Sequence, residues 1–304
     1  MSGAGSKGRA RLLLVGSTCC FALMAVLARR LSHGLGAFTA GQLAVIRFAL
    51  GAALSLAAFR LRPGLYTPRR HRLLWTRGLS GGVVVVLYFL ALARIPAGEA
   101  GMLYNLFPVI ATLMAVPAFG ERPTVHLLLA LLVASAGVGL VLGGGTLSLG
   151  LGAGELAAVG AAGFAAFSAV TIRAMRPTEN AATIFFYFCL GGLPVALPFA
   201  LDPWPLDPAA WGLAGLMALA AYGAQVMMAE AYGVLTVAEA DIWLQLTPIA
   251  QVALGAALLS ERLPALALLG VLVGVAGVAY GSVMGSRRPG AVPVRGMAGG
   301  AGPG

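Results

Sequence analysis

The sequence predicts an all-α integral membrane protein of ten transmembrane helices, arranged as two inverted five-helix repeats. Three observations carry this prediction: an apolar composition, ten apolar runs of spanning length, and an internal repeat. Of the 304 residues, 60% are hydrophobic and only 10% are charged, and the mean hydropathy is +0.92. Soluble domains carry about 25% charged residues, and disordered chains combine low hydrophobicity with high net charge. The composition excludes both classes and leaves a chain whose main solvent is lipid.

A run of about 20 apolar residues is long enough to cross the hydrocarbon core of a bilayer as a helix. The ten predicted spans are residues 11–31, 38–59, 73–93, 98–118, 124–143, 153–174, 182–201, 211–232, 238–258 and 264–284. A Gly-rich stretch after residue 142 marks the boundary between two halves. We therefore expect a cytoplasmic segment 1–10, a first repeat 11–143, a second repeat 153–284 and a disordered cytoplasmic tail 285–304.

The placement of the basic residues predicts the orientation. With the N-terminus inside, fifteen Lys and Arg residues fall on the cytoplasmic side and four on the other. Six of the fifteen are assigned to the connection between spans 2 and 3: Arg60, Arg62, Arg69, Arg70, Arg72 and Arg77. Cytoplasmic loops carry the excess of Lys and Arg, so both termini are expected in the cytoplasm. Because the net charge of +10 is spread over short clusters beside apolar runs, no nucleic-acid partner is expected.

An internal repeat relates the two halves. A shift of 140 residues aligns the segment that begins at Ala91 with the segment that begins at Ala231, without a gap. The matched pairs include Glu99 with Glu239, Pro108 with Pro248, Glu121-Arg122 with Glu261-Arg262, and Gly137 with Gly277. Five spans are an odd number, so equivalent helices would cross the membrane in opposite directions. Inverted repeats are the architecture of secondary transporters.

These features resemble the EamA family of the drug/metabolite transporter superfamily, over residues 11–284. The resemblance rests on the five-plus-five spans, the prolines in spans 4 and 9, and the turns Gly120-Glu121-Arg122 and Ser260-Glu261-Arg262 that follow them. It implies a multi-pass protein of the bacterial inner membrane that exports amino acids or related small metabolites by alternating access. Import or exchange of another class, such as nucleosides, organic acids or sugar phosphates, is the alternative. An integral membrane enzyme that acts on lipid is a third reading.

The mid-span prolines Pro108 and Pro248 predict breaks in spans 4 and 9. Each proline lacks an N–H and frees the carbonyl four residues earlier, which in a membrane must face protein or a water-filled cavity. The two faces beside them carry Asn105 in span 4 and Asp241 and Gln245 in span 9. Polar side chains at membrane depth are functional candidates, although the amides could simply bond neighbouring helices and the prolines could be packing kinks.

A cation inside span 2 adds a further candidate. Arg47 needs an acid partner or a wet cavity at that depth, and it could hold an anionic substrate group or form a structural ion pair. Glu230 in span 8 is a matching acid. The candidate cavity also includes side chains that could line it or merely pack in the core: Tyr88, Tyr222, Gln225 and Trp243.

No metal-ligand spacing, nucleotide-binding loop or catalytic triad occurs in the sequence, so no metal, cofactor or enzymatic activity is expected. The expected partners are a small-molecule substrate and the lipid bilayer. Proton coupling would require a titratable carboxylate in the cavity, for which Asp241 and Glu230 are candidates. The oligomeric state is left open, with a monomer as the expected functional unit. The cavity is expected between spans 1, 3 and 4 and their counterparts 6, 8 and 9, with spans 5 and 10 remote from it.

Overall fold

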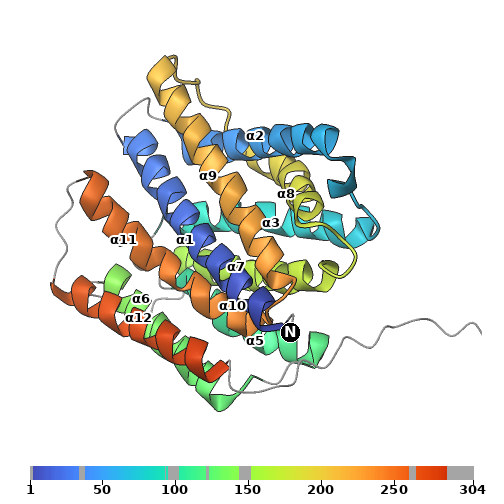
Figure 1. Ribbon diagram of the computed structural model, residues 1–304. Coiled ribbons are helices and arrows are strands. Elements are labelled where there is room, and N and C mark those ends of the chain that lie inside the picture. Colours follow the sequence, from blue (N-terminus) through green and yellow to red (C-terminus); the bar gives the residue numbers. More distant parts are fainter. Residues whose placement is uncertain are drawn as a thin grey trace, which may run out of the picture.

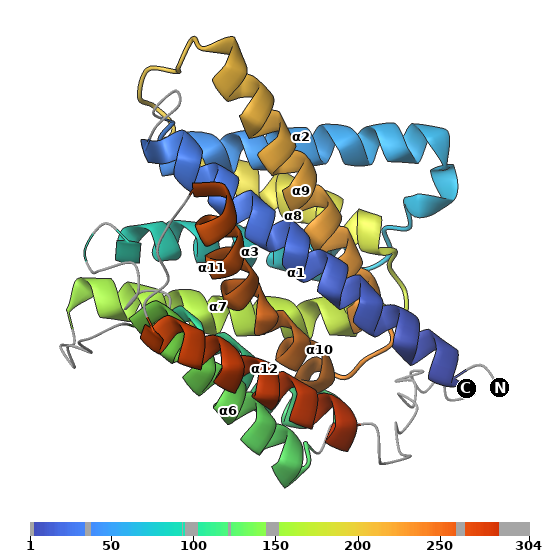
Figure 2. The ribbon, with the colours of Figure 1, turned by 60° about the vertical axis from the view of Figure 1, so that its left-hand side comes forward.

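The described residues of the computed structural model form a bundle of helices (Figures 1 and 2) and contain no strand. They are residues 3–33, 38–92, 94, 103–120, 123–143, 152–259 and 265–285. The helices are α1 (Gly3–His33), α2 (Ala40–Leu61), η1 (Pro63–Leu65), α3 (His71–Leu92), α5 (Phe107–Phe119), α6 (Val125–Gly143), α7 (Ala153–Met175), α8 (Ala181–Ala196), η2 (Leu197–Phe199), α9 (Pro208–Tyr232), α10 (Val237–Leu244), α11 (Leu246–Leu259) and α12 (Ala265–Gly285). The first half comprises α1–α6 and the second half α7–α12.

Five of these helices are long and apolar enough to cross a bilayer: Ser6–Ser32, Ala40–Leu61, Ala153–Met175, Ala181–Phe199 and Pro208–Tyr232. Shorter apolar helices run over Phe107–Phe119, Val125–Leu140 and Leu268–Gly281. The chain therefore has an all-helical membrane fold. The expected boundary between the repeats and almost all of the expected tail lie outside the described residues.

Side-chain caps fix where several helices begin. Thr39 before α2 and Thr236 before α10 each accept a bond from a backbone N–H three residues on, and Gln42 and Glu239 reach back to complete capping boxes. Asn180 caps α8 by accepting from a backbone N–H in its first turn. Such caps satisfy backbone donors that the helix itself leaves unpaired.

The packing of one half repeats in the other. Helix α1 packs along α9, and the equivalent helix α7 packs along α3. In the same way α1 contacts α11 while α7 contacts α5, and α2 contacts both α8 and α9 while α8 contacts α3. The remaining pair, α6 and α12, cross each other side by side at one edge of the bundle in both views (Figures 1 and 2).

Glycines make the α6–α12 crossing close. A Cβ added to Gly137 would lie 2.3 Å from the backbone nitrogen of Gly274, and one added to Gly277 would lie 2.6 Å from the backbone nitrogen of Ala134. The two contacts correspond under the 140-residue shift. Small residues let helix backbones approach in a membrane, which explains the glycine-rich sequence of α12.

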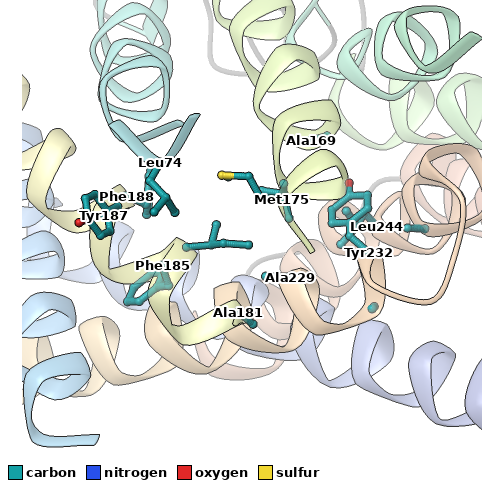
Figure 3. Packing of buried hydrophobic residues seen from close by; sticks show 14 of the residues in the cluster. Leu74, Ala169, Met175, Ala181, Phe185, Tyr187, Phe188, Ala229, Tyr232 and Leu244 are labelled. Carbon is teal, nitrogen blue, oxygen red and sulfur yellow. The ribbon is translucent and has the colours of Figure 1, made fainter. Parts of the chain in front are cut away.

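The largest core cluster lies where helices of both halves meet. Its buried members come from α1, α2, α3, α5, α7, α8, α9, α10 and the turn after α9. Figure 3 shows part of it, with Leu74 of α3 and Phe188 of α8 on one side and Tyr232 of α9 on the other. Any polar group in this region therefore lies among helices of both halves.

The second half contains the helix break expected in span 9, but three residues before the proline. Helix α10 ends at Leu244 and α11 begins at Leu246, so the interruption falls at Gln245. In the first half α5 begins at Phe107, after a turn at Asn105 and Leu106, which places Pro108 in its first helical turn. Proline fits the first turn of a helix because the N–H it lacks would be unpaired there. The two breaks correspond in the 140-residue register.

Candidate functional site

Two arginines of the first half lie against one aromatic ring of the second half. The Cζ of Arg77, on α3, lies 4.3 Å from the ring centre of Phe188 on α8. The Cζ of Arg47, on α2, lies 5.6 Å from the same ring centre and 5.8 Å from that of Phe48. Both are within cation–π distance, and the two guanidinium groups are close enough to repel each other.

Among the described residues, neither arginine has an acid as an ion-pair partner. The side chain of Arg77 is only 4% exposed, and its Nε and Nη1 are buried without an acceptor, as is the Nε of Arg47. An isolated cation inside a membrane costs about 2.5–3.5 kcal/mol even on insertion scales. Two adjacent ones are therefore retained at a clear cost to stability.

An acid and a phenol of the second half lie in the same region. The hydroxyl of Tyr232, at the end of α9, donates a hydrogen bond to Oδ1 of Asp241 on α10. Asp241 is 0% and Tyr232 1% exposed. Because the bond closes the turn between α9 and α10, the position of the carboxylate is fixed from both helices.

Tyr104 connects the cationic and acidic groups. This side chain precedes the break in the first half, and it interacts electrostatically with Arg47, Arg77 and Asp241. Its ring centre lies 4.9 Å from that of Tyr88 on α3. The arrangement therefore has positive charge from the first half and negative charge from the second, and the Tyr104 phenol is within electrostatic reach of both. We call Arg47, Arg77, Tyr104, Phe188, Tyr232 and Asp241 the central polar cluster.

Tyr222 lies at the edge of this cluster. Its ring stands edge-on to Phe185 at 5.2 Å, and it interacts electrostatically with Cys189. Cys189 is also within electrostatic reach of Arg47. Of the residues expected to line a cavity, Arg47 and Asp241 belong to the cluster. Tyr88 contacts it through the Tyr104 ring, and Tyr222 through the rings of Phe185 and Phe188.

The amide residues have other surroundings. Gln245, at the helix break, is 1% exposed and donates from Nε2 to the hydroxyl of Ser135 on α6 at 2.7 Å, while its Oε1 is buried without a donor. Asn105 and Gln225 are 8% and 9% exposed. Trp243 packs against two hydrophobic clusters, one of which includes α6 and α12 residues. The side chain of Pro248 lies outside the described residues.

Glu230 lies apart from the cluster, near the end of α9. Its Oε2 accepts a bond of 2.8 Å from Nη2 of Arg176, which follows α7, and its side chain is 40% exposed. Burial lowers the pKa of Arg176 from its usual value, and the Glu230 carboxylate opposes that shift. Arg176 also donates to the backbone oxygen of Glu179, so this pair fastens the turn after α7 to α9.

Four members of the cluster were not singled out from the sequence as site residues: Arg77, Tyr104, Phe188 and Tyr232. Arg77 was assigned to the cytoplasmic connection between spans 2 and 3, whereas the structure buries it in α3. The signal that could have found it is its position inside the predicted span 73–93. Among the described residues, no group of three or more His, Cys, Asp or Glu side chains could hold a metal ion.

Comparison with known proteins agrees with this architecture. The model of the EamA-like transporter family matches residues 8–143 and 152–282. The chain is 27% identical over 226 residues to the pseudopaline exporter CntI of Pseudomonas aeruginosa, in two strains, and the match covers 73% of this chain and 77% of the exporter. A crystal structure of a protein 20% identical in sequence has the same fold, with a TM-score of 0.79 over 91% of this chain and 98% of that one.

The two family matches fall on the first and the second half and together span most of the sequence. They agree with the repeated packing of α1–α6 and α7–α12, and the solved structure agrees with the fold as a whole. The chain therefore belongs to the EamA-like transporter family and is a membrane transporter rather than an enzyme.

Proposed function

We propose that the protein exports a small polar metabolite across a bacterial inner membrane by alternating access. The observation that carries this proposal is the central polar cluster, whose charges lie in helices of both halves of a transporter fold. Buried ionisable groups in membrane helices mark substrate or ion pathways. Export, rather than import, is supported by the pseudopaline exporter to which the chain is similar.

The proposed architecture is ten spans in two inverted five-helix repeats, with both termini in the cytoplasm. The corresponding contacts of α1 with α9 and α7 with α3 support the repeat, and the basic residues outside the spans support the orientation. Removing Arg77 from the cytoplasmic count leaves fourteen basic residues against four. The bias remains strong.

Alternating access follows from this arrangement. If each half moves as a unit, a ligand held between them faces one side of the membrane at a time. Amino acids and related compounds are the proposed class, because such compounds carry charges that match both the arginines and Asp241. The alternative role for Asp241, the buried carboxylate of the cluster, is to hold a coupling proton.

Flux measurements test the proposal directly. The purified protein is reconstituted into proteoliposomes preloaded with L-glutamate, L-leucine, L-lysine, succinate or glycerol 3-phosphate, and counterflow of the labelled compound is followed. Saturable flux of at least one solute, absent from empty liposomes, is expected. A reporter enzyme that is active only in the cytoplasm, fused after residue 285, should show activity. No flux of any solute or an external C-terminus would contradict the corresponding part of the proposal.

A further inference from the structure

We propose that Arg47 and Arg77 together bind a carboxylate group of the transported metabolite, and that this metabolite carries a net negative charge. The inference rests on the proposed transport function and names the substrate class for it. We call the two guanidinium groups, which both lie against the Phe188 ring, the anion clamp.

The first step is the uncompensated charge. Two guanidinium groups repel each other in the bundle, and no described acid pairs with either of them. A structural role would be expected to bring an ion-pair partner, because an unpaired charge inside the membrane destabilises the fold. A site whose anion arrives with the substrate explains why both charges are kept.

The second step is the number of free donors. Nε and Nη1 of Arg77 and Nε of Arg47 are buried without an acceptor. A carboxylate has two oxygens that accept about four hydrogen bonds in total, and Arg binds it in a bidentate fork. The Phe188 ring lies against both guanidinium groups, so it limits their rotation.

The third step is the charge balance. The two arginines contribute two positive charges, and Asp241, held by the Tyr232 hydroxyl, contributes one negative charge when ionised. A ligand with one net negative charge therefore neutralises the cluster. The Asp241 side favours a donor such as an ammonium group, and it disfavours a ligand that is anionic at both ends. An acidic amino acid fits this distribution better than a phosphate ester does.

Substitution of Arg77 separates an anion clamp from a structural cation. Arg77→Gln should reduce counterflow of L-glutamate by about a hundredfold, the loss typical of truncating one partner of a buried charge pair. In the absence of solute, the melting temperature of this variant should rise above that of the wild type, because one of two repelling cations is gone. Arg47→Gln should act in the same way, and Arg77→Lys should retain partial flux because it keeps the charge and loses the fork.

Exposed arginines on the same two helices supply matched controls. Arg72→Gln on α3 and Arg60→Gln on α2 remove a charge from a solvent-exposed position and should leave both flux and melting temperature near wild-type values. L-glutamate at millimolar concentration should raise the melting temperature of the wild type and of both controls. It should leave that of Arg77→Gln unchanged.

Several results would overturn the clamp. One is wild-type glutamate flux in both Arg47→Gln and Arg77→Gln. Others are loss of folded protein in both variants, preference for glycerol 3-phosphate over L-glutamate, and exclusive flux of L-lysine or L-leucine. In the last case transport stands while the anion clamp fails. Stabilisation by L-glutamate that depends on Arg77 but without any flux would instead keep the clamp and reject the transport function.

Discussion

The two halves of the molecule share a scaffold and differ in the charges they bury. In α2, Arg47 lies eight residues after the cap Thr39, and in α8 the residue eight positions after the cap Asn180 is Phe188. The two arginines of the central polar cluster therefore belong to the first half. The Asp241 carboxylate occurs in the second.

The internal repeat explains the packing of the helices but not the positions of the buried charges. The contacts of α1 with α9 and α7 with α3 follow the repeat because both halves need the same apolar packing. The charged positions do not follow it, and the proposed metabolite, whose two ends differ, would require such a difference. A symmetric fold thus holds an asymmetric site. Substitutions in the shared scaffold should reduce the stability of the fold, whereas substitutions of the charged residues should reduce flux.

The largest effect is expected where the scaffold of both halves meets. A Cβ at Gly78 of α3 would lie 2.4 Å from the carbonyl oxygen of Tyr187 on α8. Because the overlapping atom belongs to the backbone, Gly78→Leu should destabilise the fold by more than about 3 kcal/mol, above the usual range of overpacking. The measurement is the yield of monodisperse protein in detergent.

Gly163 on α7 provides the control for this substitution. No atom lies within 4 Å of an added Cβ at this position, so Gly163→Leu should leave the yield near that of the wild type. An equal yield of Gly78→Leu and wild type would show that α3 and α8 do not cross closely, and the shared scaffold would have to be revised.

An intermediate effect is expected at the acidic side of the cluster. Asp241→Asn keeps the size of the side chain and an acceptor for Tyr232, and it removes the negative charge. If this side recognises an ammonium group, counterflow of L-glutamate should fall about tenfold to a hundredfold, since hydrogen bonds to charged groups contribute about 1.5–3 kcal/mol. Counterflow of succinate, which has no amine, should fall much less.

Asp202→Asn is the control, because Asp202 is an exposed acid of the same half. It should leave flux of both solutes unchanged. An equal loss of glutamate and succinate flux in Asp241→Asn would assign Asp241 to proton coupling or to structure, and the asymmetry between the halves would then rest on the arginines alone.

Much of the fold follows from the sequence because lipid imposes simple rules on length and hydrophobicity. The span predicted at 153–174 becomes α7, Ala153–Met175, and the span predicted at 211–232 falls within α9, Pro208–Tyr232. The break in span 9 was displaced to Gln245 because Pro248 fits inside the first turn of α11. Pro248 frees the carbonyl of Leu244, so the interruption directly follows the residue whose hydrogen bond the proline removes.

The site was harder to predict, because partners come from distant helices. Glu230 lies near the end of span 8, and Asp241 lies in span 9. Only the packing shows that Glu230 meets Arg176, whereas Asp241 meets Tyr232. Likewise Arg77 is counted among six loop arginines from the sequence although it falls inside the predicted span 73–93, and the structure buries it in α3. Exposure and partners are tertiary properties, and a single sequence states neither.

The smallest effect is expected at the partly buried ion pair that joins the halves. Lys7 Nζ of α1 lies 3.0 Å from Oε1 of Glu239 on α10, whereas the Arg176–Glu230 pair lies within the second half. One partner in each pair is about 40% exposed, so each pair should contribute close to the range of about 0–1 kcal/mol found for surface pairs. Lys7→Gln and Glu230→Gln should therefore both leave the melting temperature nearly unchanged. Only the Lys7–Glu239 pair has to break if the halves move apart during transport.

Flux therefore distinguishes the two pairs where stability does not. Lys7→Gln should change the counterflow rate by up to about fivefold, the factor to which 1 kcal/mol corresponds, because it biases the equilibrium between the two conformations. Substituting Lys7 leaves the capping box of Glu239 and Thr236 intact, and Lys7→Arg should restore the wild-type rate. Glu230→Gln should leave the rate unchanged. A strong loss of flux in Glu230→Gln, with wild-type flux in Lys7→Gln, would contradict this prediction. The ion pair that matters for transport would then be Arg176–Glu230 within the second half, not the pair between the halves.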